Sequence, residues 1–183
     1  MPEPDTTYDK VRFSKEVQIA MTPSIAPSKN TPSTTVHAST QAVKGVAILG
    51  STGSIGCNAI DVVTHLGAGY RVQALAAGSS WQKIAEQARA TRPQIVVLNS
   101  DHHAAELKAA LHDTDIQVGY GPQTMVEIVQ RPDVQIVVAA VVGAAGLAPV
   151  LAAAKAGKTI ALANKEALVV AGALVIPAVK AHG

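Results

Sequence analysis

The chain has 183 residues, enough for one domain and a tail, and hydrophobic residues make up 48% of it. Only 15% of the residues are charged, against roughly 25% in an average soluble domain, so we expect other protein to cover part of the surface. The net charge of +2 gives no reason to expect nucleic acid or a membrane as a partner. The single cysteine excludes an internal disulfide and fits a reducing compartment, so we expect a cytoplasmic protein.

Residues 1–44 differ in composition from the rest of the chain. Prolines lie among serine, threonine, lysine and asparagine, and residues 22–40 have the composition of a disordered segment. A mitochondrial or plastid transit peptide would be rich in arginine and poor in acids, whereas Arg12 is the only arginine here and four residues are acidic. We therefore expect 1–44 to be a disordered, untargeted tail, or the result of a start codon assigned too early. The domain is predicted at 45–183.

The domain is organised around its first strand and the glycine-rich turn that follows. Residues 46–49 form an apolar run of the length of a buried strand, and apolar residues recur at helical spacing after Gly56. This strand–turn–helix context predicts a dinucleotide-binding turn. Gly50 would allow the tight turn, Gly53 the approach of phosphates to the main chain, and Gly56 close packing of the helix on the strand.

The donors in this turn suit a pyrophosphate. The free N–H groups at the helix start would face the ligand, with the positive end of the helix dipole behind them. Hydroxyl donors would come from Ser51, Thr52 and Ser54. The alternative is a glycine-rich turn without a ligand. A P-loop is excluded, because no Lys-Ser or Lys-Thr pair follows the last glycine.

From residue 46 onward, predicted strands and helices alternate. The strand at 135–142 is strongly β-branched and is expected in the centre of the sheet. Gly67 and Gly69 are expected to end the first helix, and Gly157 a later one. The predicted strands are 46–49, 71–76, 95–98, 116–119, 135–142 and 159–163. The predicted helices are 55–66, 81–91, a helix that ends at 111 after a cap within 99–101, 123–130, 147–156 and 166–181.

This alternation predicts an α/β fold with a doubly wound, mostly parallel sheet, a Rossmann-like domain. Ligands of such sheets bind beyond the carboxyl ends of the strands. Four loops therefore matter, at 50–56, 77–81, 142–146 and 163–166.

The loop after the second strand bears on which dinucleotide is bound. An NAD site usually has an acidic residue there for the adenosine ribose, whereas this chain has Gly78, Ser79 and Ser80. A carboxylate would repel a 2′-phosphate, while hydroxyls and main-chain N–H groups accept one, so the loop favours NADP over NAD. The alternative is that these serines only cap the next helix.

The loop at 163–166 is the second polar loop expected at this edge. Lys165 supplies a compact positive charge for a phosphate or a developing oxyanion. Asn164 suits a hydrogen bond with the nicotinamide or its ribose, and Glu166 one with a ribose hydroxyl. The alternative is that Asn164 caps the last helix and the other two side chains form its solvated first turn.

The remaining reactive side chains form no recognisable site. His102 and His103 are adjacent, not four residues apart as in a helical zinc site. Cys57 lies in the first helical turn but has no obvious base beside it. The sequence therefore suggests no Ser-His-Asp or Cys-His arrangement.

Three stretches together carry a resemblance to a known family: 50–56, 141–147 and 157–169, the last with a highly specific Leu-Ala-Asn-Lys-Glu run. They resemble the amino-terminal half of 1-deoxy-D-xylulose 5-phosphate reductoisomerase, and the resemblance extends over 45–183. It implies NADPH-dependent rearrangement and reduction of 1-deoxy-D-xylulose 5-phosphate to 2-C-methyl-D-erythritol 4-phosphate, in the non-mevalonate route to isoprenoid precursors. It also implies a divalent metal (Mg, Mn or Co) and a homodimer.

By position, the resemblance assigns two kinds of contact. Lys165 looks like a contact of the substrate, a small phosphorylated sugar. Many members have lysine or arginine where Ser79 stands, so this position leaves the strength of the NADP preference open. The residues that look like cofactor contacts are Thr52, Gly53, Ser54, Ile55, Gly78, Ser79, Ser80, Asn164 and Glu166.

The largest departure from the family is in length. In the family, a strand with Asp-Ser-Glu follows the last helix and supplies metal ligands, and a second domain adds a glutamate, a lid and the substrate phosphate site. None of these is in the 183 residues, so we expect a fragment that binds NADPH weakly and does not turn over substrate.

Two other interpretations stay open. An NADP-dependent enzyme like aspartate-semialdehyde dehydrogenase would need a nucleophilic cysteine in a later segment. A non-catalytic NADP-binding module would have neither that cysteine nor metal ligands, whereas an acidic Asp-x-Glu soon after the last helix would favour the reductoisomerase.

Overall fold

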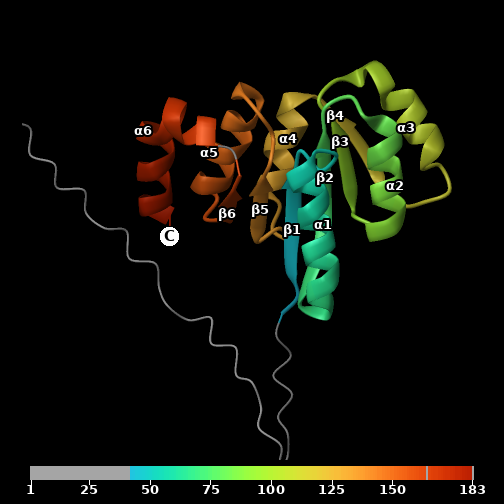
Figure 1. Cartoon of the computed structure of the whole chain (residues 1–183), viewed down its shortest axis with the longest axis horizontal. Helices are drawn as coiled ribbons and strands as arrows, with labels where there is room; N and C mark the ends of the chain where they lie inside the picture. Colours follow the sequence, from blue (N-terminus) through green and yellow to red (C-terminus); the bar gives the residue numbers. More distant parts are fainter. Residues whose placement is uncertain (1–41, 164, 183) are drawn as a thin grey trace, which may run out of the picture. The chain divides into compact units, whose positions relative to one another are not determined.

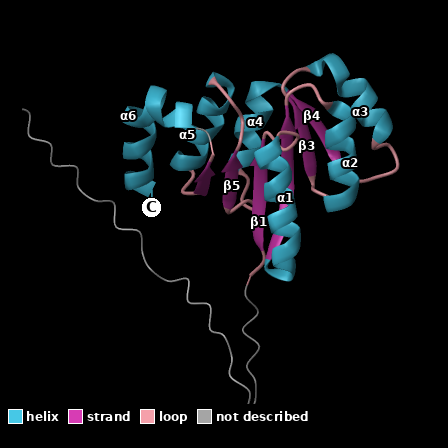
Figure 2. Cartoon of the chain, in the orientation of Figure 1, coloured by secondary structure: helices cyan, strands magenta, loops and turns pink. Residues whose placement is uncertain are grey.

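Strands and helices alternate along the part of the chain that the computed structural model describes, residues 42–163 and 165–182 (Figure 1 and Figure 2). The strands are β1 (Lys44–Leu49), β2 (Tyr70–Ala77), β3 (Ile95–Leu98), β4 (Gln117–Tyr120), β5 (Ile136–Ala139) and β6 (Thr159–Leu162). The α-helices are α1 (Ser54–Leu66), α2 (Trp81–Thr91), α3 (Ala104–Ala110), α4 (Gly121–Gln130), α5 (Leu147–Lys155) and α6 (Lys165–His182). Short 3₁₀ turns are η1 (Gly67–Gly69), η2 (Asp101–His103) and η3 (Ala144–Gly146).

The described strands form one sheet in the order β4-β3-β2-β1-β5-β6, and every neighbouring pair is parallel. Figure 1 shows this order across the picture, with α6 beyond β6 at one side. The predicted α/β class with a doubly wound parallel sheet is confirmed. The order reverses at β1, which pairs with β2 on one side and with β5 on the other. Ligands of doubly wound sheets bind at such a reversal.

The side chains of β1 alternate between the two faces of the sheet, as a strand buried on both faces requires. Val46 and Ile48 belong to a core cluster with residues of α1, α2 and α3. Ala47 and Leu49 belong to a second cluster with residues of α4 and α5. All four are at most 1% exposed, and burying a side chain such as Ile48 contributes about 1.5–3 kcal/mol. Helices therefore cover both faces of β1.

The strand predicted at 135–142 is shorter in the structure and ends at Ala139. The turn after β1 lies against the following residues, because a Cβ atom added to Gly50 would come within 2.6 Å of the Ala140 carbonyl oxygen. The chain then leaves the sheet: Val142 is 83% exposed and Gly143 has a φ of 73°. β5 is an interior strand, while β2 and β1 are the central pair.

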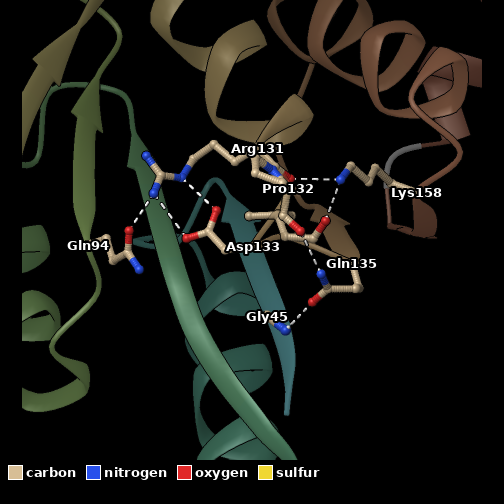
Figure 3. A network of polar contacts seen from close by, with 8 residues as sticks. Gly45, Gln94, Arg131, Pro132, Asp133, Gln135 and Lys158 are labelled. Carbon is tan, nitrogen blue, oxygen red and sulfur yellow. Dashed lines mark hydrogen bonds and ion pairs between the residues drawn. The ribbon is translucent and has the colours of Figure 1, made fainter. Parts of the chain in front are cut away.

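A loop before β5 fits tightly against the start of β1 at the amino-terminal edge of the sheet (Figure 3). Gly45 donates its N–H to the Gln135 Oε1 at 2.7 Å, and its carbonyl accepts the Gln135 N–H at 2.9 Å. The Gln135 amide nitrogen donates to the Pro132 carbonyl at 2.8 Å. A Cβ atom on Gly45 would lie 1.8 Å from the Asp133 carbonyl oxygen. Only glycine fits at this position without movement of the main chain.

Charged side chains complete this network. Lys158 donates from Nζ to the carbonyls of Arg131, at 2.7 Å, and of Val134, at 2.6 Å. The Arg131 guanidinium donates to both carboxylate oxygens of Asp133, at 2.9 and 3.0 Å, and to Gln94 Oε1 (Figure 3). This guanidinium holds the pKa of the Asp133 carboxyl below its ordinary value.

Candidate functional site

The turn after β1 is tied to the end of β2. The N–H groups of Gly50 and Ser51 both donate to the Ala76 carbonyl, at 2.8 and 2.9 Å. Gly50 has a φ of 80°, which glycine adopts without strain. A Cβ atom on Gly56 would lie 2.2 Å from the Gly50 carbonyl oxygen, so this helix can approach the strand only with glycine there. The structural roles predicted for Gly50 and Gly56 are confirmed.

Helix α1 begins with main-chain N–H groups that lack a hydrogen-bond acceptor among the described residues. Gly53 is its N-cap residue, with a φ of −75° and no side-chain cap, and it donates its own N–H to the Gly50 carbonyl at 3.1 Å. The next two N–H groups, of Ser54 and Ile55, have no acceptor in the described part of the chain, as helix geometry requires. Both residues and Gly53 are exposed. An anion placed here would meet these donors and the positive end of the helix dipole.

Two side chains of helix α2 donate hydrogen bonds to the turn after β1. Gln87 donates from Nε2 to the Ser51 carbonyl at 2.8 Å, and Lys83 donates from Nζ to the Thr52 carbonyl at 2.8 Å. The two side chains are four residues apart and therefore share one helix face. The Cys57 thiol also lies 3.6 Å from the Ser51 carbonyl, within the wider limit for sulfur. These contacts occupy carbonyl groups of the turn, while the N–H groups at the start of α1 stay open.

Sequence reasoning missed Lys83 and Gln87. Their only sequence signal is weak: two polar side chains at helical spacing, shortly after the loop at 78–80. One prediction at the turn is wrong. The Ser51 side chain is fully buried and its hydroxyl has no hydrogen-bond partner among the described residues, so it is not an exposed donor.

The loop after β2 lies beside the glycine turn, because Leu49 at the end of β1 pairs with Ala76 near the end of β2. Gly78, Ser79 and Ser80 are all exposed. Ser80 is the N-cap residue of α2, but its side chain makes no cap hydrogen bond. The alternative that Ser80 is a side-chain cap is therefore not borne out. The loop presents its hydroxyl groups to solvent.

The loop after β6 is placed only in part. The Ala163 N–H donates to the Ala139 carbonyl at 3.0 Å, which ties the loop to the end of β5. Helix α6 begins at Lys165. Asn164 lies outside the described residues, and the side chains of Lys165 and Glu166 are not described. The roles predicted for these three residues stay predictions.

The structure thus brings together the loops predicted to contact the cofactor diphosphate and adenosine, at the ends of the neighbouring strands β1 and β2. The loop with Lys165 follows β6, which is separated from β1 by β5. Among the described side chains, those of 42–163 and 172–182, no group of three or more His, Cys, Asp or Glu residues is placed to hold a metal ion.

Comparison with known proteins gives a consistent family. The family model described as 1-deoxy-D-xylulose 5-phosphate reductoisomerase matches residues 46–172. A protein of that name from Agathobacter rectalis is 45% identical over 141 residues, which are 77% of this chain and 37% of the relative. Another, from Nitrosococcus oceani, is 48% identical over 141 residues, 76% of this chain and 36% of the relative.

Comparison with solved structures points to the same family. The chain is similar to 1-deoxy-D-xylulose 5-phosphate reductoisomerase from Zymomonas mobilis in complex with NADPH, with a TM-score of 0.74 and 38% identity, over 77% of this chain and 37% of that one. It is also similar to a DOX-P reductoisomerase in complex with magnesium, with a TM-score of 0.74 and 41% identity, over 77% of this chain and 36% of that one. The chain spans a little over a third of the length of the curated relatives it matches. Since the family model matches more than half of its residues, the chain belongs to the 1-deoxy-D-xylulose 5-phosphate reductoisomerase family.

Proposed function

We propose that this chain is the NADPH-binding part of an enzyme that isomerises and reduces 1-deoxy-D-xylulose 5-phosphate to 2-C-methyl-D-erythritol 4-phosphate. One observation carries the proposal: the N–H groups at the start of α1 have no acceptor among the described residues and belong to exposed residues, beside the reversal of strand order. Membership of the family and the NADPH named in the complex of the Zymomonas mobilis relative support it.

In this proposal the glycine turn binds the cofactor diphosphate. Ser54 and Ile55 would donate their N–H groups to its oxygens, and the dipole of α1 would favour its negative charge. Thr52 completes the turn, and the absence of a side chain at Gly53 would let the phosphates approach. A Cβ atom there would lie 3.4 Å from the Gly50 carbonyl oxygen, an ordinary contact, so the fold itself does not require glycine at this position.

The other two loops would bind the ends of the cofactor and the substrate. Gly78, Ser79 and Ser80 would contact the 2′-phosphate and the ribose that carries it. Asn164 and Glu166 are proposed to contact the nicotinamide half, and Lys165 the phosphorylated substrate. Bound NADPH would supply the hydride for the reduction.

The divalent metal belongs to the proposal for the longer protein. Magnesium is named in complexes of solved relatives. The residues described here do not offer a ligand set for it, so no step of the reaction is derived through a metal.

The family match favours the reductoisomerase over the alternative that resembles aspartate-semialdehyde dehydrogenase. A non-catalytic NADPH-binding module remains the second candidate, because the described residues support binding without offering a metal-ligand set. Turnover by a longer chain that includes this one would separate the two.

We further propose that 45–183 forms the NADPH-binding domain and that the full-length enzyme is a cytoplasmic homodimer. The low charged fraction of 15% and the single cysteine support these points. None of the described helices has the length and apolar character needed to cross a membrane.

The test is calorimetric titration of the 183-residue chain with NADPH. We expect heat from a single site. A flat titration would contradict the proposal. Adding Mg²⁺ and 1-deoxy-D-xylulose 5-phosphate then tests the expectation that this chain binds without turnover, because steady oxidation of NADPH would contradict it.

A further inference from the structure

The loop that would receive the 2′-phosphate of NADPH contains no cation. Gly78, Ser79 and Ser80 offer hydroxyl and N–H donors only, although a phosphate group at neutral pH carries between one and two negative charges. A positive charge from another part of the structure would strengthen the selection of NADPH over NADH beyond what these neutral donors supply.

Lys83 provides that charge at the right place. It lies in the first turn of α2, three residues after Ser80, and its side chain reaches the glycine turn, with Nζ 2.8 Å from the Thr52 carbonyl oxygen. The side chain therefore extends from the helix that follows the loop after β2 to the loop after β1. It belongs to the helix whose positive dipole end faces the second of these loops.

No described side chain neutralises this charge. Lys83 is exposed, and among the described residues no carboxylate lies within ion-pair distance of it. Its hydrogen-bond partner is a neutral carbonyl, which uses one of the three ammonium protons. Two donors remain available to a ligand. Lys158 at the opposite edge differs, because its ammonium is partly buried and donates to two carbonyls.

We propose that Lys83 is a specificity-determining residue that binds the 2′-phosphate of NADPH and so replaces the cation missing from the loop at 78–80. The inference rests on the proposed function, since it assumes that a dinucleotide occupies the glycine turn. NADH has no 2′-phosphate and gains nothing from this contact. The preference for NADPH should therefore be electrostatic and should weaken as salt is added.

The test compares NADPH with NADH on the full 183-residue chain, by calorimetry at low salt. Lys83→Met keeps the aliphatic stem and removes the charge. We expect it to raise the Kd for NADPH about tenfold, as loss of a hydrogen bond to a charged group does, with less than about a twofold change for NADH. Lys83→Arg should retain the preference for NADPH. Lys44→Met, which removes an exposed lysine at the opposite end of β1, should change neither Kd.

The possible results separate the inference from the proposed function. If Lys83→Met weakens NADPH and NADH equally, Lys83 only positions the turn through Thr52, and the inference is overturned. No change in either Kd overturns it too, as does wild-type protein that binds both nucleotides equally well. If wild-type protein binds neither nucleotide, the proposed function itself fails and the inference falls with it.

Discussion

The two edges of the sheet use polar groups in opposite ways. At the amino-terminal edge, Lys158 and Gln135 donate to carbonyls of the loop before β5 (Figure 3). At the carboxyl edge, Lys83 and Gln87 also donate to carbonyls of the turn after β1, but the first N–H groups of α1 have no acceptor among the described residues. In the first arrangement, side chains of the protein satisfy the loop carbonyls. The second leaves main-chain donors for an anion. The amino-terminal edge is therefore called the structural edge, and the carboxyl edge the proposed binding edge.

A cavity lined by arginine side chains lies away from the proposed cofactor site. This cavity of about 600 Å³ lies at the amino-terminal edge, and Arg71, Arg89 and Arg92 are among its lining residues. Arg89 is already paired with Asp113 at 2.6 Å, and this contact lowers the pKa of the Asp113 carboxyl. We therefore propose the unpaired main-chain donors at the glycine turn, and not this cavity, as the anion site.

The largest expected effect is at the structural edge. Gly45→Ala would place a Cβ atom 1.8 Å from the Asp133 carbonyl oxygen, so the main chain must move. We expect the free energy of unfolding to fall by about 3 kcal/mol or more, measured by urea denaturation. Gly69→Ala is the matched control, because nothing lies within 4 Å of its added Cβ atom. Equal stability of the two variants would show that the tight fit at Gly45 is wrong.

At the binding edge, a glycine substitution should act on the ligand and leave the fold largely intact. Gly53→Val keeps an allowed φ of −75° and meets no protein atom closely at Cβ, so we expect about 1 kcal/mol of lost stability. The side chain would occupy the space proposed for the phosphates and should raise the Kd for NADPH about 100-fold. Titration of this variant and of Gly69→Ala measures the effect. A Kd like that of the wild type would mean that phosphates do not approach the turn here.

Lys158→Met should lower the free energy of unfolding without changing the affinity for NADPH. It leaves the carbonyls of Arg131 and Val134 without their ammonium donor, at a cost of about 2 kcal/mol of stability. The Kd for NADPH should not change. Lys155→Met, on an exposed side chain in the last turn of α5, is the control and should stay within about 0.5 kcal/mol of the wild type. Weaker NADPH binding in Lys158→Met would mean that the two edges are coupled.

The smallest expected effect is a dependence on pH. The Arg131 guanidinium lowers the pKa of Asp133 in the folded protein below its ordinary 3.8, so the unfolded chain takes up the proton first as the pH falls. The ion pair therefore contributes fully above about pH 4, and its contribution is lost below that. Asp133→Asn should remove about 1 kcal/mol or less of the stability at pH 7 and almost none at pH 2. Urea denaturation at both pH values tests this, and an equal loss at both would contradict it.

Most of the fold followed from periodicity in the sequence. Apolar runs such as 46–49 and 95–98 became buried parallel strands, and Gly67, with a φ of 67°, ends α1 as expected. The end of β5 could not be predicted, because the apolar run continues to Val142. A contact distant in sequence decides it, since the turn at Gly50 lies against Ala140 and the chain leaves the sheet there.

The site was predictable where it is local. The glycine spacing indicated the turn, and the absence of an acid at 78–80 favoured NADP over NAD, which stays a prediction. Lys83 and Gln87 act through carbonyl groups more than thirty residues away in the sequence, which no local pattern reveals. The buried hydroxyl of Ser51 was missed for the same reason, because burial depends on how α1 and α2 pack over the turn.

The most direct test of the account is an amide NMR titration of the ¹⁵N-labelled chain with NADPH. We expect large chemical-shift changes for the N–H signals of Ser54 and Ile55, at the start of α1, and no change for those of Gly45 and Gln135 at the structural edge. Unchanged signals from the start of α1 in the presence of saturating NADPH, or shifts confined to the structural edge, would contradict it.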